Sequence, residues 1–253
     1  MEEARRALKL PPVEHADYEK NFVRTAVCEL RFPALLELET RPPDALQKAL
    51  RKDFPLYQKR KAVTGIMIGG DTDFQLRHHF ESKEKKWTVA FHSSSIALET
   101  TAYRGFLDFE ERLGRVLKAV EPIIDADFFT RVGLRYINAL PYTSAAEFEG
   151  WVNPELAGTL VKGPFGDVAA FWQEARGVAE RGSFSFRHGL AEADSPRREY
   201  ILDFDFYDEN VEVGDVPAAV KDLHDASYRL FRWAAGPKTI EALGQVVTRG
   251  AKK

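Results

Sequence analysis

Three short sequence patterns occur twice in this chain of 253 residues, in the same order each time, and this repetition constrains the fold more than any other feature. Residues 29–32, 74–80 and 87–91 have counterparts at residues 133–136, 184–190 and 200–204. The clearest match is FQLRHHF at 74–80, which returns as FSFRHGL. The paired patterns lie 104, 110 and 113 residues apart, as small insertions in a duplicated unit would produce.

Both halves predict the same order of elements: a strand, a helix, several antiparallel strands and a long helix. In the first half we expect strands at about 22–32, 35–39, 62–69, 73–81, 86–92 and 95–101, and a helix at about 44–53. In the second half we expect strands at about 128–140, 168–176, 181–190 and 198–207, and helical residues at 144–160, broken by Asn153-Pro154.

Each half closes with a long amphipathic helix, because apolar residues recur at helical spacing. The first is expected at about 105–120, and Pro122 should end it. Its apolar stripe comprises Phe106, Phe109, Leu113, Val116, Leu117 and Val120. The second is expected from Asp215 to about Ala234, with a buried face of Val216, Val220, Leu223, Leu230 and Phe231. A short helix at 238–247 should follow.

These elements predict an α+β protein built by tandem duplication of a strand-helix-multistrand-helix unit. Two such units side by side can form a curved antiparallel sheet with two long helices packed on it, similar to the TATA-binding-protein-like or helix-grip architectures. Such a likeness of fold implies no function. The expected divisions are an N-terminal arm at 1–20, repeats at 21–124 and 125–235, and a short helix and tail at 236–253.

Composition narrows the class of protein. The net charge is −3 with mixed signs along the chain, whereas nucleic-acid binders usually carry a net basic domain, so we do not expect a nucleic-acid partner. No apolar run approaches the roughly 18 residues that a membrane span needs, and no apolar signal region follows the first residues. We therefore expect a cytoplasmic protein with no membrane partner. The single cysteine, Cys28, should be a buried, inert thiol.

His78 and His188 hold matching positions in the repeat, and each shares a strand face with apolar residues. They form either a pair of imidazoles that binds an anion or a metal, or two core histidines with backbone carbonyl partners, which we favour. Arg77 and Arg187 point to the opposite strand face. They form either a guanidinium pair for a phosphate or carboxylate, or a solvated, salt-bridged face, which we also favour.

Arg31 and Arg135 also match across the repeat and lie in apolar strands, so each should have a carboxylate partner, which Glu29 or Asp203 can supply. Asp203 and Asp205 share a strand face at a separation of roughly 7 Å. Such a pair can hold a divalent cation or divide acid and base roles, but it lacks a third acidic group. We expect one aspartate to pair with a strand arginine and the other to face water.

Motifs for built metal, nucleotide or nucleophile sites are absent from the sequence. No His-x-x-x-His, Cys-x-x-Cys or Glu-x-x-His spacing occurs, nor any glycine-rich phosphate loop or Gly-x-Ser-x-Gly elbow. His224 is expected at the edge of the surface of its helix. We therefore expect no catalytic residues, no metal and no cofactor.

Several stretches resemble a sporadically distributed bacterial family of conserved hypothetical proteins with no established function. The most specific is FFTRVGLRYIN at 128–138, and residues 30–33, 54–57 and 200–205 add shorter matches. The resemblance spans most of the chain, from about Asn21 to Phe231. It implies a compact bacterial cytosolic protein, and the patchy distribution of the family implies an accessory role such as phage defence.

We therefore expect a non-enzymatic binding or regulatory protein whose partner is an unknown protein or small molecule, with a homodimer as one option. The expected ligand-binding residues are Arg77, His78, Arg135, Arg187, His188 and Tyr200. Aromatic residues expected to line a cleft are Trp87, Trp151, Trp172, Tyr200 and Tyr207. One alternative is a metal-dependent hydrolase or nuclease using Asp203, Asp205 and His188. Another is a protein–protein interaction module, which would expose a large apolar patch.

Overall fold

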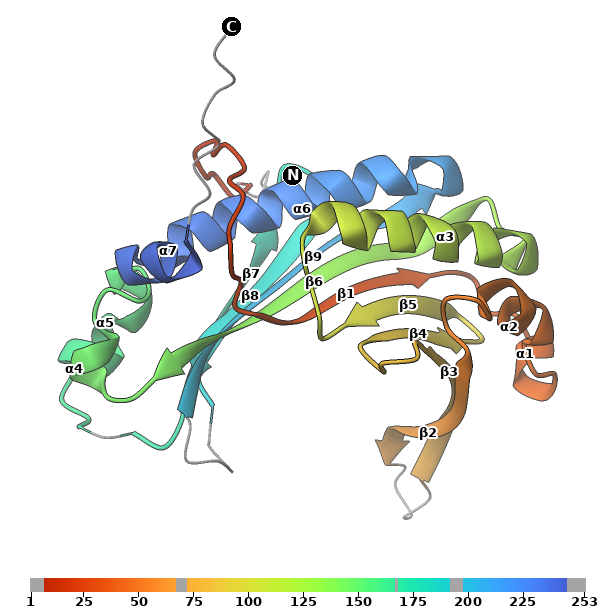
Figure 1. The fold of residues 1–253 in the computed structure, drawn as a ribbon, viewed down its shortest axis with the longest axis horizontal. Helices are drawn as coiled ribbons and strands as arrows, with labels where there is room; N and C mark the ends of the chain where they lie inside the picture. The colour runs from red at the N-terminus through yellow and green to blue at the C-terminus, as the bar shows by residue number, and fades with distance from the viewer. Residues whose placement is uncertain (1–6, 67–71, 167, 192–197, 245–253) are drawn as a thin grey trace, which may run out of the picture. The chain divides into compact units, whose positions relative to one another are not determined.

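The strands of the protein form one large antiparallel sheet and helices join them, which confirms the predicted α+β class (Figure 1). A computed structural model describes residues 7–66, 72–166, 168–191 and 198–244. In these residues the sheet has nine strands, in the order β2-β3-β4-β5-β1-β6-β9-β8-β7. Their bounds are β1 Val23–Arg31, β2 Leu56–Ile66, β3 Thr72–Glu81, β4 Trp87–His92, β5 Ser95–Thr100, β6 Phe128–Tyr142, β7 Phe171–Val178, β8 Ser183–Leu190 and β9 Arg198–Glu212.

The helices lie between and after these strands. They are α1 Glu37–Thr40, α2 Asp44–Leu50, α3 Phe106–Ile124, α4 Ala145–Phe148, α5 Pro154–Lys162, α6 Val216–Ala234 and α7 Pro237–Leu243, with a 3-10 turn, η1, at Val213–Asp215. Among the described residues, no helix is both long enough and apolar enough to cross a bilayer.

The chain divides into two compact units that are not its two consecutive halves. Unit 1 consists of Met1–Arg24, Arg135–Phe206 and Leu223–Lys253, and unit 2 consists of Thr25–Leu134 and Tyr207–Asp222. The elements β1, β6, β9 and α6 therefore contribute residues to both units. The repeats predicted from the sequence, at 21–124 and 125–235, do not cut through any of these elements. They stay a prediction.

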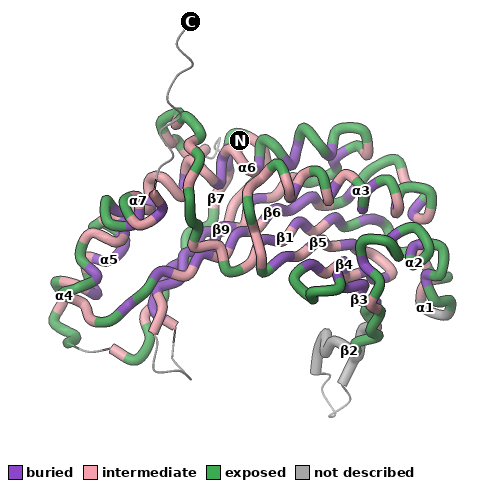
Figure 2. The backbone as a smooth tube through the Cα atoms, viewed as in Figure 1, coloured by how far each residue is buried: buried purple, intermediate pink, exposed green. Residues whose placement is uncertain are grey.

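In unit 2 the core lies between α3 and the strands that it covers (Figure 1). Of the predicted helical stripe, Phe106 is only half-buried, whereas the other members are buried: Phe109, Leu113, Val116, Leu117 and Val120. Along β1, buried residues alternate with less buried ones, so one strand face belongs to this core (Figure 2). Cys28 lies on that face with no exposed surface, and burial raises the pKa of its thiol to about 12, which suits the expected inert role.

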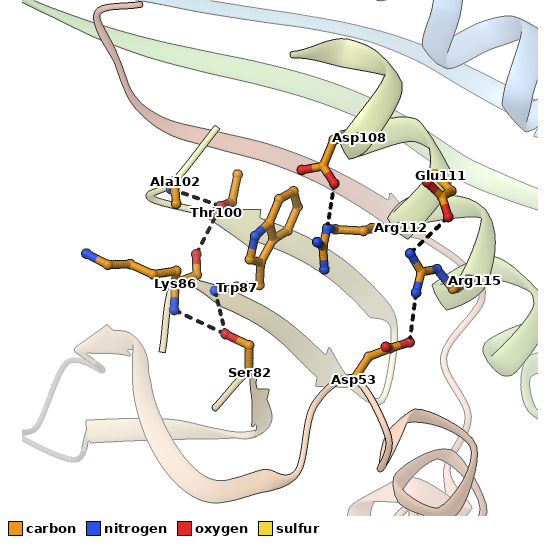
Figure 3. A network of polar contacts seen from close by, with 10 residues as sticks. All are labelled: Asp53, Ser82, Lys86, Trp87, Thr100, Ala102, Asp108, Glu111, Arg112 and Arg115. Carbon is orange, nitrogen blue, oxygen red and sulfur yellow. Dashed lines mark hydrogen bonds and ion pairs between the residues drawn. The ribbon is translucent and has the colours of Figure 1, made fainter. Parts of the chain in front are cut away.

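Polar contacts hold α3 to the strands and loops beneath it (Figure 3). The Arg112 guanidinium lies 4.5 Å from the centre of the Trp87 ring on β4 and donates to Asp108 on its own helix. Arg115 bridges Glu111 and Asp53, the latter just after α2. The helix therefore covers its strands through cation–π and ion-pair contacts at its margin as well as through its apolar stripe.

Along α6 the predicted apolar face is mostly correct. Val216, Val220, Leu223 and Leu230 are buried, but Phe231 is only half-buried, contrary to the prediction. In unit 1 the Phe231 ring meets Phe204 of β9 edge-on, with ring centroids 6.3 Å apart.

Two predictions of secondary structure are wrong. Residues 35–39 were expected as a strand, but Glu37–Thr40 form α1, because leucine and glutamate favour helix and the segment has no strand partner. Pro122 does not end its helix, since α3 continues to Ile124. A proline in the last turn removes a single hydrogen bond there, while Ile124 is buried and Asp125 ends the helix in a left-handed conformation.

Other boundaries differ by a few residues. Strand β2 begins at Leu56 rather than at about 62, and β9 extends to Glu212. Two predicted elements extend outside the described residues. These are the strand at 62–69, by residues 67–69, and the helix at 238–247, by residues 245–247.

The described part of the predicted N-terminal arm, residues 7–20, is attached to unit 1. The Leu8 N–H donates to the Val178 carbonyl of β7 at 2.7 Å. Further along, the Glu19 and Lys20 N–H groups donate to carbonyls at the end of α7. These backbone hydrogen bonds fix the path of a segment that has little regular structure of its own.

Candidate functional site

Two arginines converge on the carboxylate of Asp203 in unit 1. Arg135 of β6 donates from Nε to Oδ1 and from Nη2 to Oδ2, each at 2.7 Å. Arg187 of β8 donates from Nη2 to Oδ2 at 3.2 Å. The expected pairing of Asp203 with Arg135 is confirmed, and Arg187 joins it. We refer to these three residues as the Asp203 cluster.

The Asp203 cluster combines a shielded carboxylate with partly exposed cations. The Asp203 side chain is 8% exposed, whereas those of Arg135 and Arg187 are 37% and 48% exposed. The hydrogen bond to Asp203 raises the pKa of Arg135. Both oxygens of Asp203 accept hydrogen bonds from guanidinium groups, so the carboxylate holds the two arginines in place.

His188 lies on the opposite strand face from the Asp203 cluster. It follows Arg187 directly on β8, and successive side chains of a strand point to opposite faces. Its Nδ1 is 2.7 Å from the Tyr200 hydroxyl, and its ring stacks on Phe186 with centroids 5.0 Å apart. Asp203 and His188 therefore do not meet in one site.

His188 and Tyr200 form a buried pair in the core of unit 1. Tyr200 has no exposed surface, and burial raises the pKa of its hydroxyl. Burial also lowers the pKa of His188 to about 4, so the imidazole is neutral near pH 7. The expected backbone carbonyl partner is replaced by a phenol, because Tyr200 on β9 brings its hydroxyl within reach.

A second pair of the same kind occurs in unit 2. The Tyr57 hydroxyl of β2 is 2.9 Å from Nδ1 of His78, which is buried, and the two rings stack. Burial, with a smaller contribution from Lys59, lowers the pKa of His78. Arg77, the preceding residue of β3, is exposed on the other face. The structure therefore gives both predicted histidines a tyrosine partner.

The aromatic residues predicted to line a cleft differ widely in burial. Trp87 and Tyr200 are buried in the cores of units 2 and 1 respectively. Tyr207 lies under the Arg131 guanidinium at 4.6 Å, and Trp172 is half-exposed on β7. An open depression of about 600 Å³ in unit 2, lined by residues around Phe128 and Gly214, contains none of the predicted site residues.

The sequence did not predict a polar cluster in which the N-terminal segment contacts α6. His15 Nε2 lies 2.9 Å from Asp225 Oδ1, and its ring stacks on those of Tyr228 and His224, with centroids 4.3 and 5.2 Å apart. His224 Nδ1 is 3.1 Å from the Tyr136 hydroxyl of β6. His224 and Asp225 are adjacent in the sequence, which was the only local signal of this cluster. His15 gave none, because it is 210 residues away from Asp225.

Comparison with known proteins adds no functional assignment to this geometry. The sequence matches no model of a known protein family. It also has no match among curated proteins.

Proposed function

We propose that the protein is a non-enzymatic binding protein that uses the Asp203 cluster to recognise a small ligand bearing a carboxylate or phosphate group. The observation that carries the proposal is that one shielded carboxylate holds two guanidinium groups, each with a third to a half of its side chain exposed. Guanidinium groups match carboxylate and phosphate geometry through paired N–H donors. Groups fixed before the ligand arrives lose less conformational entropy on binding.

The same geometry argues against the hydrolase or nuclease alternative. Both oxygens of Asp203 accept hydrogen bonds from arginine, so coordinating a metal or accepting a proton would require breaking them. His188 points to the opposite face, where it pairs with Tyr200. A general acid–base mechanism needs its groups within hydrogen-bond reach of one substrate, which supports binding without catalysis.

A binding experiment with a matched variant tests the proposal. Arg187→Gln removes one donor group from the cluster, and Arg176→Gln removes the same charge from β7, where Arg176 pairs with Glu174. We expect titration calorimetry with inorganic phosphate and with citrate to detect binding of at least one of them. Arg187→Gln should weaken it about tenfold, the usual size of a charge-assisted hydrogen bond. Equal losses in both variants would mean that only net charge matters, and no binding by the native protein would refute the proposal for these ligand classes.

We further propose that the fold arose by the predicted duplication and resembles the TATA-binding-protein-like or helix-grip architectures. In support, α3 and α6 each have 19 residues and each follows a set of antiparallel strands. The last strand before each helix also neighbours the first strand of its half, β5 beside β1 and β9 beside β6. The first half has one more strand than the second, so one strand would lack a counterpart.

The resemblance to the bacterial family supports placing this binding function in the cytoplasm, in an accessory role such as phage defence. The test is deletion of the gene in its native host, followed by challenge with phages. We expect more plaques on the deletion strain, and we expect Arg187→Gln to behave like the deletion while Arg176→Gln behaves like the native protein. Equal plaque counts on all strains would remove the defence role without affecting the binding proposal.

A further inference from the structure

Three side chains with metal-binding atoms meet in unit 1 where residues 7–20 contact α6. His15 comes from the N-terminal segment, and His224 and Asp225 are neighbours on the helix. One ligand atom from each lies within 4.8 Å of the others. Tetrahedral zinc sites, with metal–ligand distances near 2.1 Å, place ligand atoms about 3.4 Å apart. The ligand atoms would therefore have to approach one another by up to about 1.4 Å to coordinate one ion.

The rings of the two histidines are held by neighbours that do not themselves bind metal. A metal-ligating histidine usually uses its second ring nitrogen for a hydrogen bond, which fixes the orientation of the ring. His224 has such a partner in the Tyr136 hydroxyl, 3.1 Å from its Nδ1. The His15 ring stacks on Tyr228, whose hydroxyl accepts from the Ala16 N–H at 3.1 Å. The site is thus supported from β6 and α6.

Hydrogen bonding and exposure at the site also suit metal binding. Neutral imidazole and ionised carboxylate are the forms that bind metal. His15 and Asp225 share a hydrogen bond, and a cation between them would replace it. The side chains of His15 and Asp225 are 49% and 42% exposed, so an ion can reach them from solvent.

We infer that His15, His224 and Asp225 bind one divalent transition-metal ion, with Zn²⁺ as the expected metal. Two imidazoles and one carboxylate are the protein ligands of many zinc sites that keep a water in the fourth position. Imidazole ligands disfavour Mg²⁺ and Ca²⁺, which prefer oxygen. Because His15 lies in the N-terminal segment, the ion would join that segment to α6. This inference is independent of the proposed ligand-binding role of the Asp203 cluster.

Calorimetric titration of chelator-treated full-length protein with ZnCl₂ tests the site. We expect one equivalent to bind, with at least tenfold weaker binding in His15→Ala and in Asp225→Asn, since loss even of a hydrogen-bond partner to a ligand costs 10- to 100-fold. His79→Ala, which removes a half-buried histidine of unit 2, should bind like the native protein. Unaltered affinity in His15→Ala and Asp225→Asn, or no stoichiometric binding by the native protein, would refute the site.

Hydrogen exchange separates this site from adventitious zinc binding at a surface histidine. The Ala16 amide, next to His15, should exchange more slowly in native protein with Zn²⁺ than without it, because the bound ion keeps the segment on α6. In His15→Ala, Zn²⁺ should leave that rate unchanged. His15 is half-exposed, so this variant should retain the fold, which its unfolding midpoint without zinc will verify. Equal slowing in both proteins would contradict the inference.

Discussion

Units 1 and 2 each hold one carboxylate between two arginines, but the two arrangements differ in geometry and in exposure to water. In unit 1, Asp203 on β9 accepts a bidentate pair of hydrogen bonds from Arg135 on the neighbouring strand β6, and its side chain is 8% exposed. In unit 2, Glu29 Oε1 accepts from Arg31, two residues along the same strand, at 2.6 Å and from Arg131 at 3.5 Å. Its side chain is 27% exposed, and that of Arg31 is 55% exposed.

The difference predicts that matching residue types contribute unequally to stability in the two units. Water and salt screen the exposed pair on β1, so its contribution to stability should be at most about 1 kcal/mol. Asp203 is shielded, so removal of its charge would leave two guanidinium groups facing each other in a partly desolvated site. The repeat motif predicted that Arg31 and Arg135 have carboxylate partners, but the surroundings of each pair decide what it contributes.

The largest expected effects come from the apolar cores, where the two units should behave alike. Leu113 on α3 and Leu223 on α6 are both buried. We expect Leu113→Ala and Leu223→Ala each to lower the free energy of unfolding by about 2–5 kcal/mol, measured by urea denaturation. A loss under about 0.5 kcal/mol in either variant would mean that the residue faces solvent.

Asp203→Asn and Glu29→Gln should lower the free energy of unfolding by different amounts. We expect Asp203→Asn to cost about 2 kcal/mol, because the neutral amide no longer compensates the two arginines. Glu29→Gln should cost less than about 1 kcal/mol, since its 2.6 Å partner Arg31 is 55% exposed and the 17% exposed Arg131 lies farther away, at 3.5 Å. Urea denaturation of both variants measures the difference, and equal costs would show that burial of Asp203 has no energetic consequence.

The elements of the fold were largely predictable because their signals are local. Strand β1 and the apolar stripe of α3 depend on residues a few positions apart, and both are confirmed except at Phe106, which is only half-buried. The exceptions are segments where a local pattern suits two structures, such as residues 35–39, or where one buried side chain outweighs a proline, as at Pro122.

The candidate site was predictable only where an electrostatic requirement limited the choice of partner. Arg135 needed a carboxylate, and Asp203 was one of the two that the sequence offered. By contrast, the tyrosine partner of His188 depends on the position of a neighbouring strand. The contact between His15 and Asp225 joins segments 210 residues apart, for which sequence spacing carries no signal.

The two histidine–tyrosine pairs extend the comparison to pH dependence. Burial lowers the pKa of His188 to about 4 from its usual 6.5, so between these values the unfolded chain binds a proton that the folded protein does not. Stability should therefore fall as the pH falls from 6.5 to 4, and this contribution should then level off. We expect His188 to account for a loss of about 1–2 kcal/mol, measured by urea denaturation at stepped pH.

Variants of both histidines assign this pH dependence to its source. His188→Gln should flatten the dependence between pH 6.5 and 4. His78→Gln should flatten it less, because the Tyr57 partner of His78 is 41% exposed whereas Tyr200 has no exposed surface. An equal effect of the two variants would show that the pairs are energetically equivalent despite their different exposure.

The smallest expected change in the free energy of unfolding is that of Arg31→Gln, and its dependence on salt tests whether the ion pair is solvated. Arg31→Gln should change the free energy of unfolding by less than about 0.5 kcal/mol at low salt, because the side chain is more than half exposed. At about 1 M NaCl the Debye length falls to roughly 3 Å, so even this difference should vanish. Arg135→Gln, which breaks the bidentate pair with shielded Asp203, should keep most of its larger cost in the same salt. If salt abolishes the effects of both variants, the Asp203 cluster is as well solvated as the pair on β1, and the contrast between the two units rests on geometry alone.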